Sequence, residues 1–291
     1  MKKIAAIADI HGNYIAFDKC VEYALQRGVD TFLLLGDFVA ELPYPQKTME
    51  RLYALKEKYE CIFIRGNKED YWLEHQRNGN SKVVLKDNDS TTGMLLYTYN
   101  NLTEKDLKFY DAMPIVRKIQ FAGYPSFTVC HGTPYKANEK MIPSTDRIHE
   151  IMNELDTDLI VCGHTHIQSK YEYNGKKCLN TGACGIALGG KIEFIILQGD
   201  ENGWIEELVS LDYDVSQVLK DIEESGIEAS APSWTKVTKD IIKGGHTFHS
   251  KVLFRAMDLC EEELGECNWP EVPEKYWEMA IKEMLYEEEK K

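Results

Sequence analysis

The chain has 291 residues, of which 43% are hydrophobic and 11% are aromatic, and its formal net charge at pH 7 is −14. This composition supports a full hydrophobic core and is not typical of a disordered protein. The acidic balance argues against nonspecific nucleic-acid binding, because such a surface needs clustered basic residues. It also makes an anionic substrate difficult to bind unless a local positive charge reverses the field.

The sequence also bears on location and redox state. No apolar run approaches the roughly 18 residues of a membrane span. The apolar stretch after Lys3 is broken by Asp9, too early for a signal peptide. We therefore predict a cytoplasmic protein with no membrane partner. The eight cysteines form no CxxC pair and mostly lie in apolar runs, which predicts free, reduced thiols.

Five segments share one form, an apolar run followed by a polar cluster. They are residues 3–13, 31–37, 61–67, 126–132 and 159–166. Continuous apolar runs of this length predict strands that are buried on both faces. The stretches between the first three runs, residues 13–28 and 46–59, have apolar positions at near-helical spacing. The resulting order, strand–helix–strand–helix–strand, predicts a layered α/β fold.

The later part of the chain continues with helices and hairpins. Residues 103–114 predict a helix capped by Thr103, and residues 146–156 predict a second helix. Between them, a hairpin turns at residues 123–125. Residues 170–211 alternate strand-like runs with glycine-containing turns, which predicts a second, antiparallel-rich sheet that closes a sandwich.

From Val215 onward the pattern is helical and acidic. We therefore divide the chain into a domain of residues 1–212 and a mostly helical C-terminal appendage of residues 213–291. We expect the appendage to pack on or near the active site.

The polar clusters that follow the apolar runs carry the functional signal. In open α/β sheets the ligand site lies beyond the carboxyl ends of the strands. The side chains expected there are Asp9, His11, Asp37, Asn67, His131, His164 and His166. Each motif alone is ordinary, since Gly-Asp and Gly-Asn are common turns and a single histidine is often structural. Together, these carboxylate, imidazole and amide groups suit first-row transition metals, and seven ligands are enough for two metals that share a carboxylate.

The same motifs resemble the signature of the calcineurin-like metallophosphoesterases. They are Asp9-Ile10-His11-Gly12-Asn13, Gly36-Asp37, Gly66-Asn67, His131-Gly132 and Gly163-His164-Thr165-His166. The resemblance covers residues 1 to about 200 and implies a four-layer α/β/β/α sandwich with two divalent metal ions. It assigns Asp9, His11 and His166 to one metal and Asn67, His131 and His164 to the other. Asp37 is then the bridging ligand.

Two divalent metals also remove the difficulty with an anionic substrate. They bring four positive charges against two ligand carboxylates, Asp9 and Asp37, and so attract a small phosphorylated substrate. The implied reaction is attack on phosphorus by a hydroxide that bridges the metals, without a phosphoenzyme. This ligand set tolerates manganese, iron, zinc, cobalt or nickel, and we predict manganese.

One motif departs from the family pattern. Many members have Gly-Asn-His-(Asp/Glu), with that histidine near the leaving group, whereas Lys68 follows Asn67 here. Lysine has a reference pKa of about 10.4 and is a poorer proton donor near neutrality than imidazole. We predict that Lys68 contacts phosphate oxygens; alternatively, it points into solvent or pairs with Glu69. This favours phosphodiesters or phosphoanhydrides with good leaving groups, such as dinucleoside polyphosphates.

The C-terminal segment carries a second, shorter resemblance. Residues 211–228 and 241–251 resemble the tail of a bacterial branch similar to asymmetric diadenosine tetraphosphate hydrolases, which likewise lack the acid histidine. His246 and His249 are three residues apart and share a face if the segment is helical. The sequence leaves three roles open for them: they supply the missing acid, they contact the substrate, or they are surface residues of the appendage. Water is a further candidate for the acid.

Two other functions use the same fold. A serine/threonine-type protein phosphatase needs a shallow, exposed pocket and a different acid. A catalytically inactive binding scaffold is expected to have lost metal ligands, whereas this chain has all seven candidates. The GxxxxGK[ST], GxGxxG and GxSxG motifs do not occur in the sequence. A metal-dependent hydrolase is therefore the favoured prediction.

Overall fold

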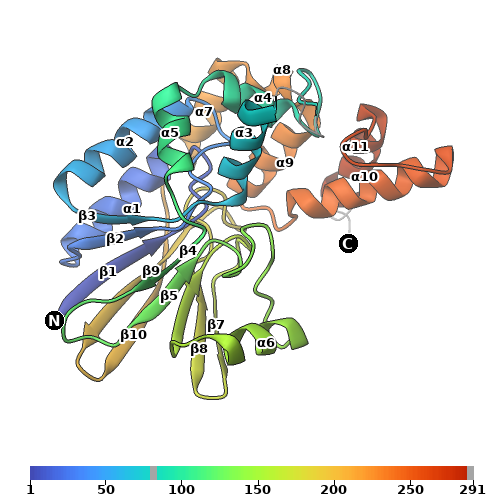
Figure 1. Cartoon of the computed structure of the whole chain (residues 1–291). Coiled ribbons are helices and arrows are strands. Elements are labelled where there is room, and N and C mark those ends of the chain that lie inside the picture. Colours follow the sequence, from blue (N-terminus) through green and yellow to red (C-terminus); the bar gives the residue numbers. More distant parts are fainter. Residues whose placement is uncertain (79–83, 287–291) are drawn as a thin grey trace.

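Two five-stranded sheets form the centre of the computed structural model, which describes residues 1–78 and 84–286 (Figure 1). Sheet A has the order β10-β9-β1-β2-β3 and sheet B has the order β4-β5-β6-β8-β7. The strands of sheet A are β1 (Lys2–Ile7), β2 (Thr31–Leu34), β3 (Glu60–Phe63), β9 (Ile192–Asp200) and β10 (Gly203–Leu211). The strands of sheet B are β4 (Val116–Ile119), β5 (Phe127–Cys130), β6 (Leu159–Cys162), β7 (Ser169–Tyr173) and β8 (Lys176–Asn180).

Each sheet contains three adjacent parallel strands. β1, β2 and β3 run parallel in sheet A, and β5, β6 and β8 run parallel in sheet B. The five predicted apolar runs form β1, β2, β3, β5 and β6, so all five strand predictions are confirmed. Their continuous hydrophobicity reflects burial on both faces. In β1, Ile4 and Ala6 belong to the core between the sheets, whereas Ala5 and Ile7 pack against the helices.

Helices cover the outer faces of both sheets. The helices in the first part of the chain are α1 (Tyr14–Gln26), α2 (Pro45–Lys58), α3 (Asn67–Asn78), α4 (Gly93–Asn100), α5 (Glu104–Asp111) and α6 (Asp146–Glu154). α1 and α2 lie over sheet A, and α6 lies against sheet B (Figure 1). The predicted cap of α5 is a capping box of Thr103 and Asp106. The four-layer α/β/β/α architecture is thus confirmed.

The structure divides residues 170–211 between the two sheets, whereas the sequence predicted one antiparallel-rich sheet. The β7–β8 hairpin lies in sheet B. The β9–β10 hairpin extends sheet A, where β9 runs antiparallel to β1 and pairs Ile196 with Ala5. Turn residues specify a hairpin locally, but they carry no information about which sheet edge the hairpin joins. Both sheets are consequently mixed.

The chain is helical after β10. These helices are α7 (Val215–Ser225), α8 (Ile227–Ser230), α9 (Pro232–Ile242), α10 (His249–Leu264) and α11 (Glu274–Ile281), followed by the π-helical turn η1 (Lys282–Tyr286). They share a hydrophobic core that includes Tyr276 and Trp277 and also takes in Leu42 and Ile186 from the part of the chain before β10. α10 and α11 project from one side of the sandwich (Figure 1).

Two further sequence predictions concern thiols and membranes. The eight cysteines are all free thiols, six of them buried, as predicted. Among the helices of the described residues, none combines the length and the apolar character needed to cross a membrane.

Candidate metal centre

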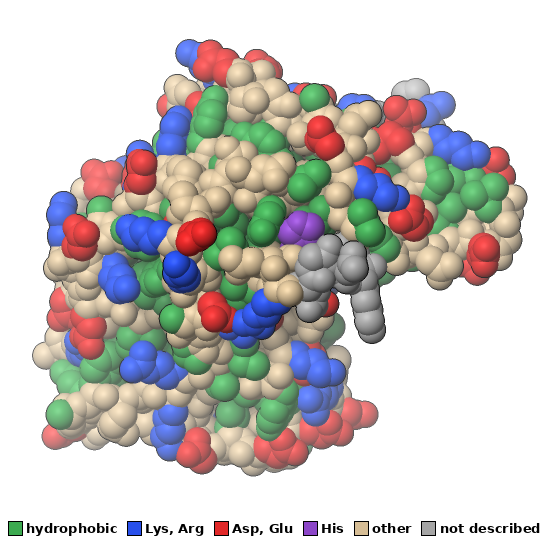
Figure 2. Space-filling model, turned by 45° about the horizontal axis from the view of Figure 1, so that its top comes forward, with side chains coloured by type: hydrophobic (Ala, Val, Ile, Leu, Met, Phe, Trp, Pro, Cys, Tyr) green, Lys and Arg blue, Asp and Glu red, His purple; other side chains and the backbone are tan. Residues whose placement is uncertain are grey.

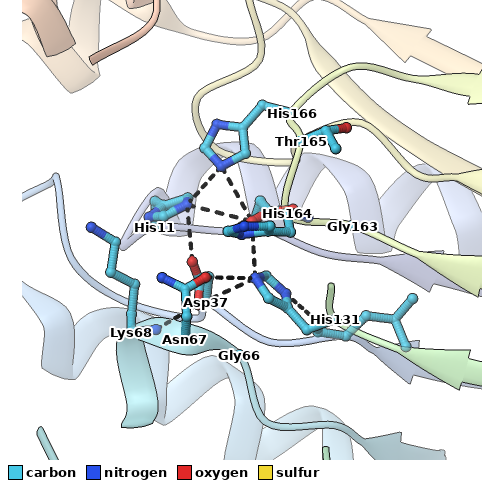
Figure 3. Close-up of polar contacts among 12 residues, drawn as sticks. His11, Asp37, Gly66, Asn67, Lys68, His131, Gly163, His164, Thr165 and His166 are labelled. Carbon is cyan, nitrogen blue, oxygen red and sulfur yellow. Dashed lines mark hydrogen bonds and ion pairs between the residues drawn. The ribbon is translucent and has the colours of Figure 1, made fainter. Parts of the chain in front are cut away.

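The seven predicted ligands follow the carboxyl ends of five strands. In sheet A, Asp9 and His11 follow β1, Asp37 follows β2, and Asn67 is the first residue of α3 after β3. In sheet B, His131 follows β5, and His164 and His166 follow β6. Six of them form two groups, in each of which the candidate ligand atoms lie within 4.8 Å of one another. Figure 3 shows the four histidines of these groups around Asp37. Group 1 is Asp9, His11 and His166, and group 2 is Asp37, His131 and His164.

The backbone at these positions is unusual. Five of the predicted ligands have left-handed backbone conformations, with φ of 55° at Asp9, 50° at His11, 54° at Asp37, 67° at His164 and 57° at His166. A non-glycine residue in this conformation costs roughly 1–2 kcal/mol. Hydrogen bonds between loops hold it, since the N–H of Asp9 donates to the Gly36 carbonyl at 3.1 Å and that of His11 to the Asp37 carbonyl at 3.0 Å.

The two carboxylates lie between the histidines of the two groups. Asp37 Oδ2 is 3.8 Å from His11 Nε2, and Asp37 Oδ1 is 3.5 Å from His131 Nε2. Asp9 Oδ1 is 3.2 Å from His166 Nε2 and 3.9 Å from His131 Nε2. Burial raises the pKa values of both carboxyls, but neighbouring histidines outweigh it. His166 and His131 lower the pKa of Asp9, and His131 and His11 lower the pKa of Asp37, so the two groups stay ionised.

These side chains fit a pair of metal ions. Asp9 Oδ1 is buried and accepts no hydrogen bond within the described part of the chain. The Nε2 atoms of His11 and His166 face each other at 3.2 Å. Ring nitrogens and carboxylate oxygens that converge in this way form the mixed N/O donor set of a first-row transition metal. The two His/Asp groups are consistent with a dinuclear metal site.

His131 is oriented by a contact on its far side. Its Nδ1–H donates to the Leu35 carbonyl at 2.6 Å, so Nε2 faces the centre and lies 3.2 Å from Asn67 Oδ1. This places Asn67 beside group 2, the group to which the family resemblance assigns it. Burial alone lowers the pKa of His131, but Asp37 and Asp9 raise it to about 10. A metal ion that binds here must therefore displace a proton.

Glu69 connects two of the ligand loops, a role that the sequence did not reveal. Its carboxylate is fully buried and accepts the backbone N–H groups of Gly66 at 2.8 Å, Asp37 at 2.9 Å and Phe38 at 2.9 Å. Burial and the nearby charge of Asp37 raise the pKa of Glu69 to about 7. In the sequence, Glu69 is visible only as an acidic residue two positions after Asn67, and this spacing does not predict which groups it contacts.

Lys68 neither points into solvent nor pairs with Glu69. Its Nζ lies 2.6 Å from Oε1 of Glu41, and its side chain is 15% exposed. Figure 3 shows Lys68 extending alongside His11. Burial lowers the pKa of Lys68, but Glu41 and Asp37 raise it by more, so the amine stays charged. The pKa of Glu41 shifts in the opposite direction: burial raises it, but Lys68 and His249 lower it by more, to about 2. No sequence pattern indicated Glu41.

The two C-terminal histidines lie in different settings. His246 precedes α10 and is exposed, whereas His249 is the first residue of the helix, so they do not share a helical face. His249 is buried, and its Nε2 lies 2.8 Å from Thr238 Oγ1. Burial lowers the pKa of His249 to about 3, so the imidazole is uncharged near neutral pH and is poorly suited to donate a proton.

A cavity of about 210 Å³ opens onto the centre. The predicted ligands in its wall include His11, Asp37 and His166, and the C-terminal segment contributes Trp234, Phe248 and His249. Figure 2 shows a histidine at the surface beside hydrophobic side chains, on a face where acidic and basic side chains are interspersed. The cavity therefore combines a polar floor with a partly apolar wall.

Gly66 leaves no room for a side chain beside Asp37. A Cβ atom at Gly66 would lie 2.3 Å from Asp37 Oδ1 and 2.5 Å from its backbone nitrogen. We expect Gly66→Ala to displace Asp37 and to lower metal affinity about 10- to 100-fold, as loss of ligand support does elsewhere. Calorimetric titration of the protein with metal measures this change in affinity.

The control for that substitution is Gly123→Ala. Its Cβ meets nothing within 4 Å, although its φ of +81° carries a backbone cost. It is expected to lower stability and leave metal affinity unchanged. Equal metal affinity in Gly66→Ala and the unmodified protein contradicts the close packing of Gly66 against Asp37.

Several known proteins are similar to this chain in sequence or in structure. An uncharacterised protein of Methanocaldococcus jannaschii, MJ0912, is 24% identical over 250 residues, which are 79% of this chain and 94% of that protein. The crystal structure of the hypothetical protein PH1004 from Pyrococcus horikoshii has a TM-score of 0.71 at 17% identity and covers 85% of this chain and 100% of that one. A metallophosphoesterase from Sphaerobacter thermophilus has a TM-score of 0.63 at 18% identity and covers 84% of this chain and 99% of that one.

The two structures share the fold of this chain. The sequence model of the calcineurin-like phosphoesterases matches residues 2–168, which include all seven predicted ligands and more than half of the chain. On this match, and with two His/Asp groups at the strand ends, the chain belongs to the calcineurin-like phosphoesterase family.

Proposed function

We propose that this chain is a dinuclear metal-dependent phosphoesterase that hydrolyses phosphodiester or phosphoanhydride bonds of small nucleotide-type substrates, such as dinucleoside polyphosphates. The observation that carries the proposal is the pair of His/Asp groups, with the carboxylates of Asp9 and Asp37 between them, at the base of a cavity. Lys68 lines the same cavity and adds a positive charge.

The ligands divide between two cations. Asp9, His11 and His166 would hold one, and His131, His164 and Asn67 the other, with Asp37 between them. Bound there, two divalent ions supply Lewis-acid activation of water and neutralise charge on the phosphoryl group. We propose manganese, although iron, zinc, cobalt and nickel suit the same donors.

Lys68 supports the proposal that the cleaved bond is a phosphodiester or phosphoanhydride with a good leaving group. A charged ammonium on this wall of the cavity binds phosphate oxygens as a point charge, but it donates a proton poorly at neutral pH. His249 is uncharged near neutral pH and His246 lies outside the cavity wall, so neither C-terminal histidine replaces the acid. Leaving groups that depart without protonation, namely phosphates and aryl oxides, are therefore favoured over alkoxides.

A second cavity supports a substrate larger than a phosphate group. It has a volume of about 540 Å³ and shares Asn67 with the first cavity. Its wall includes Arg65 and the rings of Tyr71 and Tyr135. Aromatic and cationic side chains beside a phosphate site suit a nucleoside or a further phosphate. This agrees with the resemblance of the C-terminal segment to asymmetric diadenosine tetraphosphate hydrolases.

A substrate panel tests this proposal. The manganese-loaded protein is assayed with an alkyl phosphate ester, an aryl phosphodiester, a dinucleoside polyphosphate and a phosphoserine peptide, and the products are identified. We expect the aryl diester and the dinucleotide to be cleaved fastest. Fastest cleavage of the alkyl ester or the peptide favours a protein phosphatase. Absence of turnover with two metals bound favours a binding scaffold.

A further inference from the structure

Three side chains link the C-terminal helices to the candidate metal centre. Lys68 Nζ lies 2.6 Å from Glu41 Oε1, and the indole Nε1–H of Trp234 in α9 donates to Glu41 Oε2. Glu41 is 2% exposed. All three residues line the cavity of about 210 Å³ that opens onto His11 and His166. The link therefore ends inside the proposed active site.

Each oxygen of the buried Glu41 carboxylate has its own donor. A buried carboxylate is strongly unfavourable unless it is paired and hydrogen-bonded. Lys68 supplies the charge at Oε1, and Trp234 supplies the second hydrogen bond at Oε2. The two contacts act on opposite oxygens, so together they fix the rotation of the carboxylate.

The C-terminal helices hold Trp234 in one orientation. Its ring stacks on His249 of α10 at a centroid distance of 4.5 Å, with 25° between the planes. Trp277 of α11 packs against it edge-on at 5.7 Å. His249 is itself held by Thr238, whose Oγ1 lies 2.8 Å from His249 Nε2. The direction of the Trp234 N–H is thus set by packing among three helices.

The contacts around Glu41 matter because the side chain of Lys68 is long and flexible. Its four-carbon side chain loses up to about 2 kcal/mol of rotamer entropy when it is fixed in one place. Resting on the phosphoesterase function proposed above, we infer that Trp234 is a positioning residue that holds Glu41, and through it Lys68, for contact with the substrate phosphate. The C-terminal helices thereby complete the active site of the N-terminal sandwich.

Trp234→Phe tests this inference because it keeps an aromatic ring and removes the N–H donor. We expect kcat/KM for an aryl phosphodiester to fall about 10-fold, as for other residues that orient a ligand, with metal content unchanged. The inhibition constant of inorganic phosphate is expected to rise by a similar factor. The matched control is Trp204→Phe, which loses an indole hydrogen bond of 2.8 Å to the Pro125 carbonyl, away from the cavity. It is expected to leave both constants unchanged.

A double-mutant cycle separates positioning from a general structural effect. If Trp234 acts through Lys68, Trp234→Phe has no further effect on kcat/KM or phosphate inhibition in a Lys68→Met background. A tenfold loss that recurs in that background overturns the inference, because it shows an action that does not pass through Lys68.

Two measurements do not depend on turnover. The chain has five tryptophans, and the ¹⁵N-indole NMR signal of Trp234 is the one missing from Trp234→Phe. Glu41→Gln is expected to shift that signal and leave the Trp204 signal in place; an unmoved Trp234 signal overturns the inference.

Calorimetry gives the affinity of the manganese-loaded protein for inorganic phosphate. If no ester is cleaved, the proposed function fails, and the inference is then judged by whether Trp234→Phe weakens phosphate binding.

Discussion

Replacement of Asp37 with asparagine is expected to lower kcat by about 10³-fold and to reduce the metal content below two ions per chain. Asparagine preserves the shape of the side chain and tolerates the left-handed backbone at this position, where φ is 54°. The loss is therefore one of charge at the carboxylate that lies between His11 and His131. Lost stabilisation of about 4 kcal/mol corresponds to the thousandfold change. Turnover of an aryl phosphodiester and elemental analysis measure the two effects.

The control for Asp37→Asn is Asp18→Asn. Asp18 is an exposed carboxylate that pairs with Arg51 at 2.7 Å, away from the metal centre. Its substitution is expected to change stability by less than about 1 kcal/mol and to leave kcat unchanged. Two bound metals and undiminished turnover in Asp37→Asn disprove the assignment of Asp37 as the shared ligand.

Glu69→Ala is expected to cause the largest loss of stability among single substitutions near the site. It leaves three backbone N–H groups, those of Gly66, Asp37 and Phe38, without their acceptor in a buried position. Each unsatisfied group costs about 1–3 kcal/mol, so the free energy of unfolding should fall by about 3–9 kcal/mol. That is a large part of the roughly 5–15 kcal/mol typical of a folded domain. Urea unfolding with excess chelator measures the change without a contribution from metal binding.

Two variants calibrate this result. Glu74→Ala removes an exposed carboxylate from the same helix and should change stability by about 0.5 kcal/mol or less. Glu69→Gln retains one acceptor oxygen and should lie between Glu69→Ala and the unmodified chain. If Glu69→Ala unfolds at the same urea concentration as Glu74→Ala, the three hydrogen bonds contribute little.

The strands and the candidate ligands could be predicted because both depend on local pattern. An apolar run that ends in a polar motif identifies a buried strand, and the carboxyl ends of parallel strands meet at one edge. Asp9, His11 and Asp37 follow such runs directly, and so do His131 and His164. Their proximity follows from the layered fold, although the left-handed backbone at most of these positions has no visible signal in the sequence.

The remaining features depend on contacts between distant segments. Glu41 and Trp234 are separated by 193 positions, and their hydrogen bond depends on how the C-terminal helices pack. The positions of His246 and His249 depended on where α10 begins, and element boundaries are the least reliable part of a sequence prediction. The division of residues 170–211 between two sheets likewise depended on which strand edges were free. Local pattern contains none of this information.

Both groups take side chains from segments that follow strands of both sheets, so cations bound there would act as cross-links between the layers of the sandwich. Group 1 joins Asp9 and His11, which follow β1 of sheet A, to His166, which follows β6 of sheet B, and group 2 joins Asp37 to His131 and His164. By thermodynamic linkage, an occupied site adds about 2.7 kcal/mol to stability when free metal is one hundred times its Kd. For the metal-dependent phosphoesterase proposed above, the stability of the fold and the activity therefore depend on the same supply of metal.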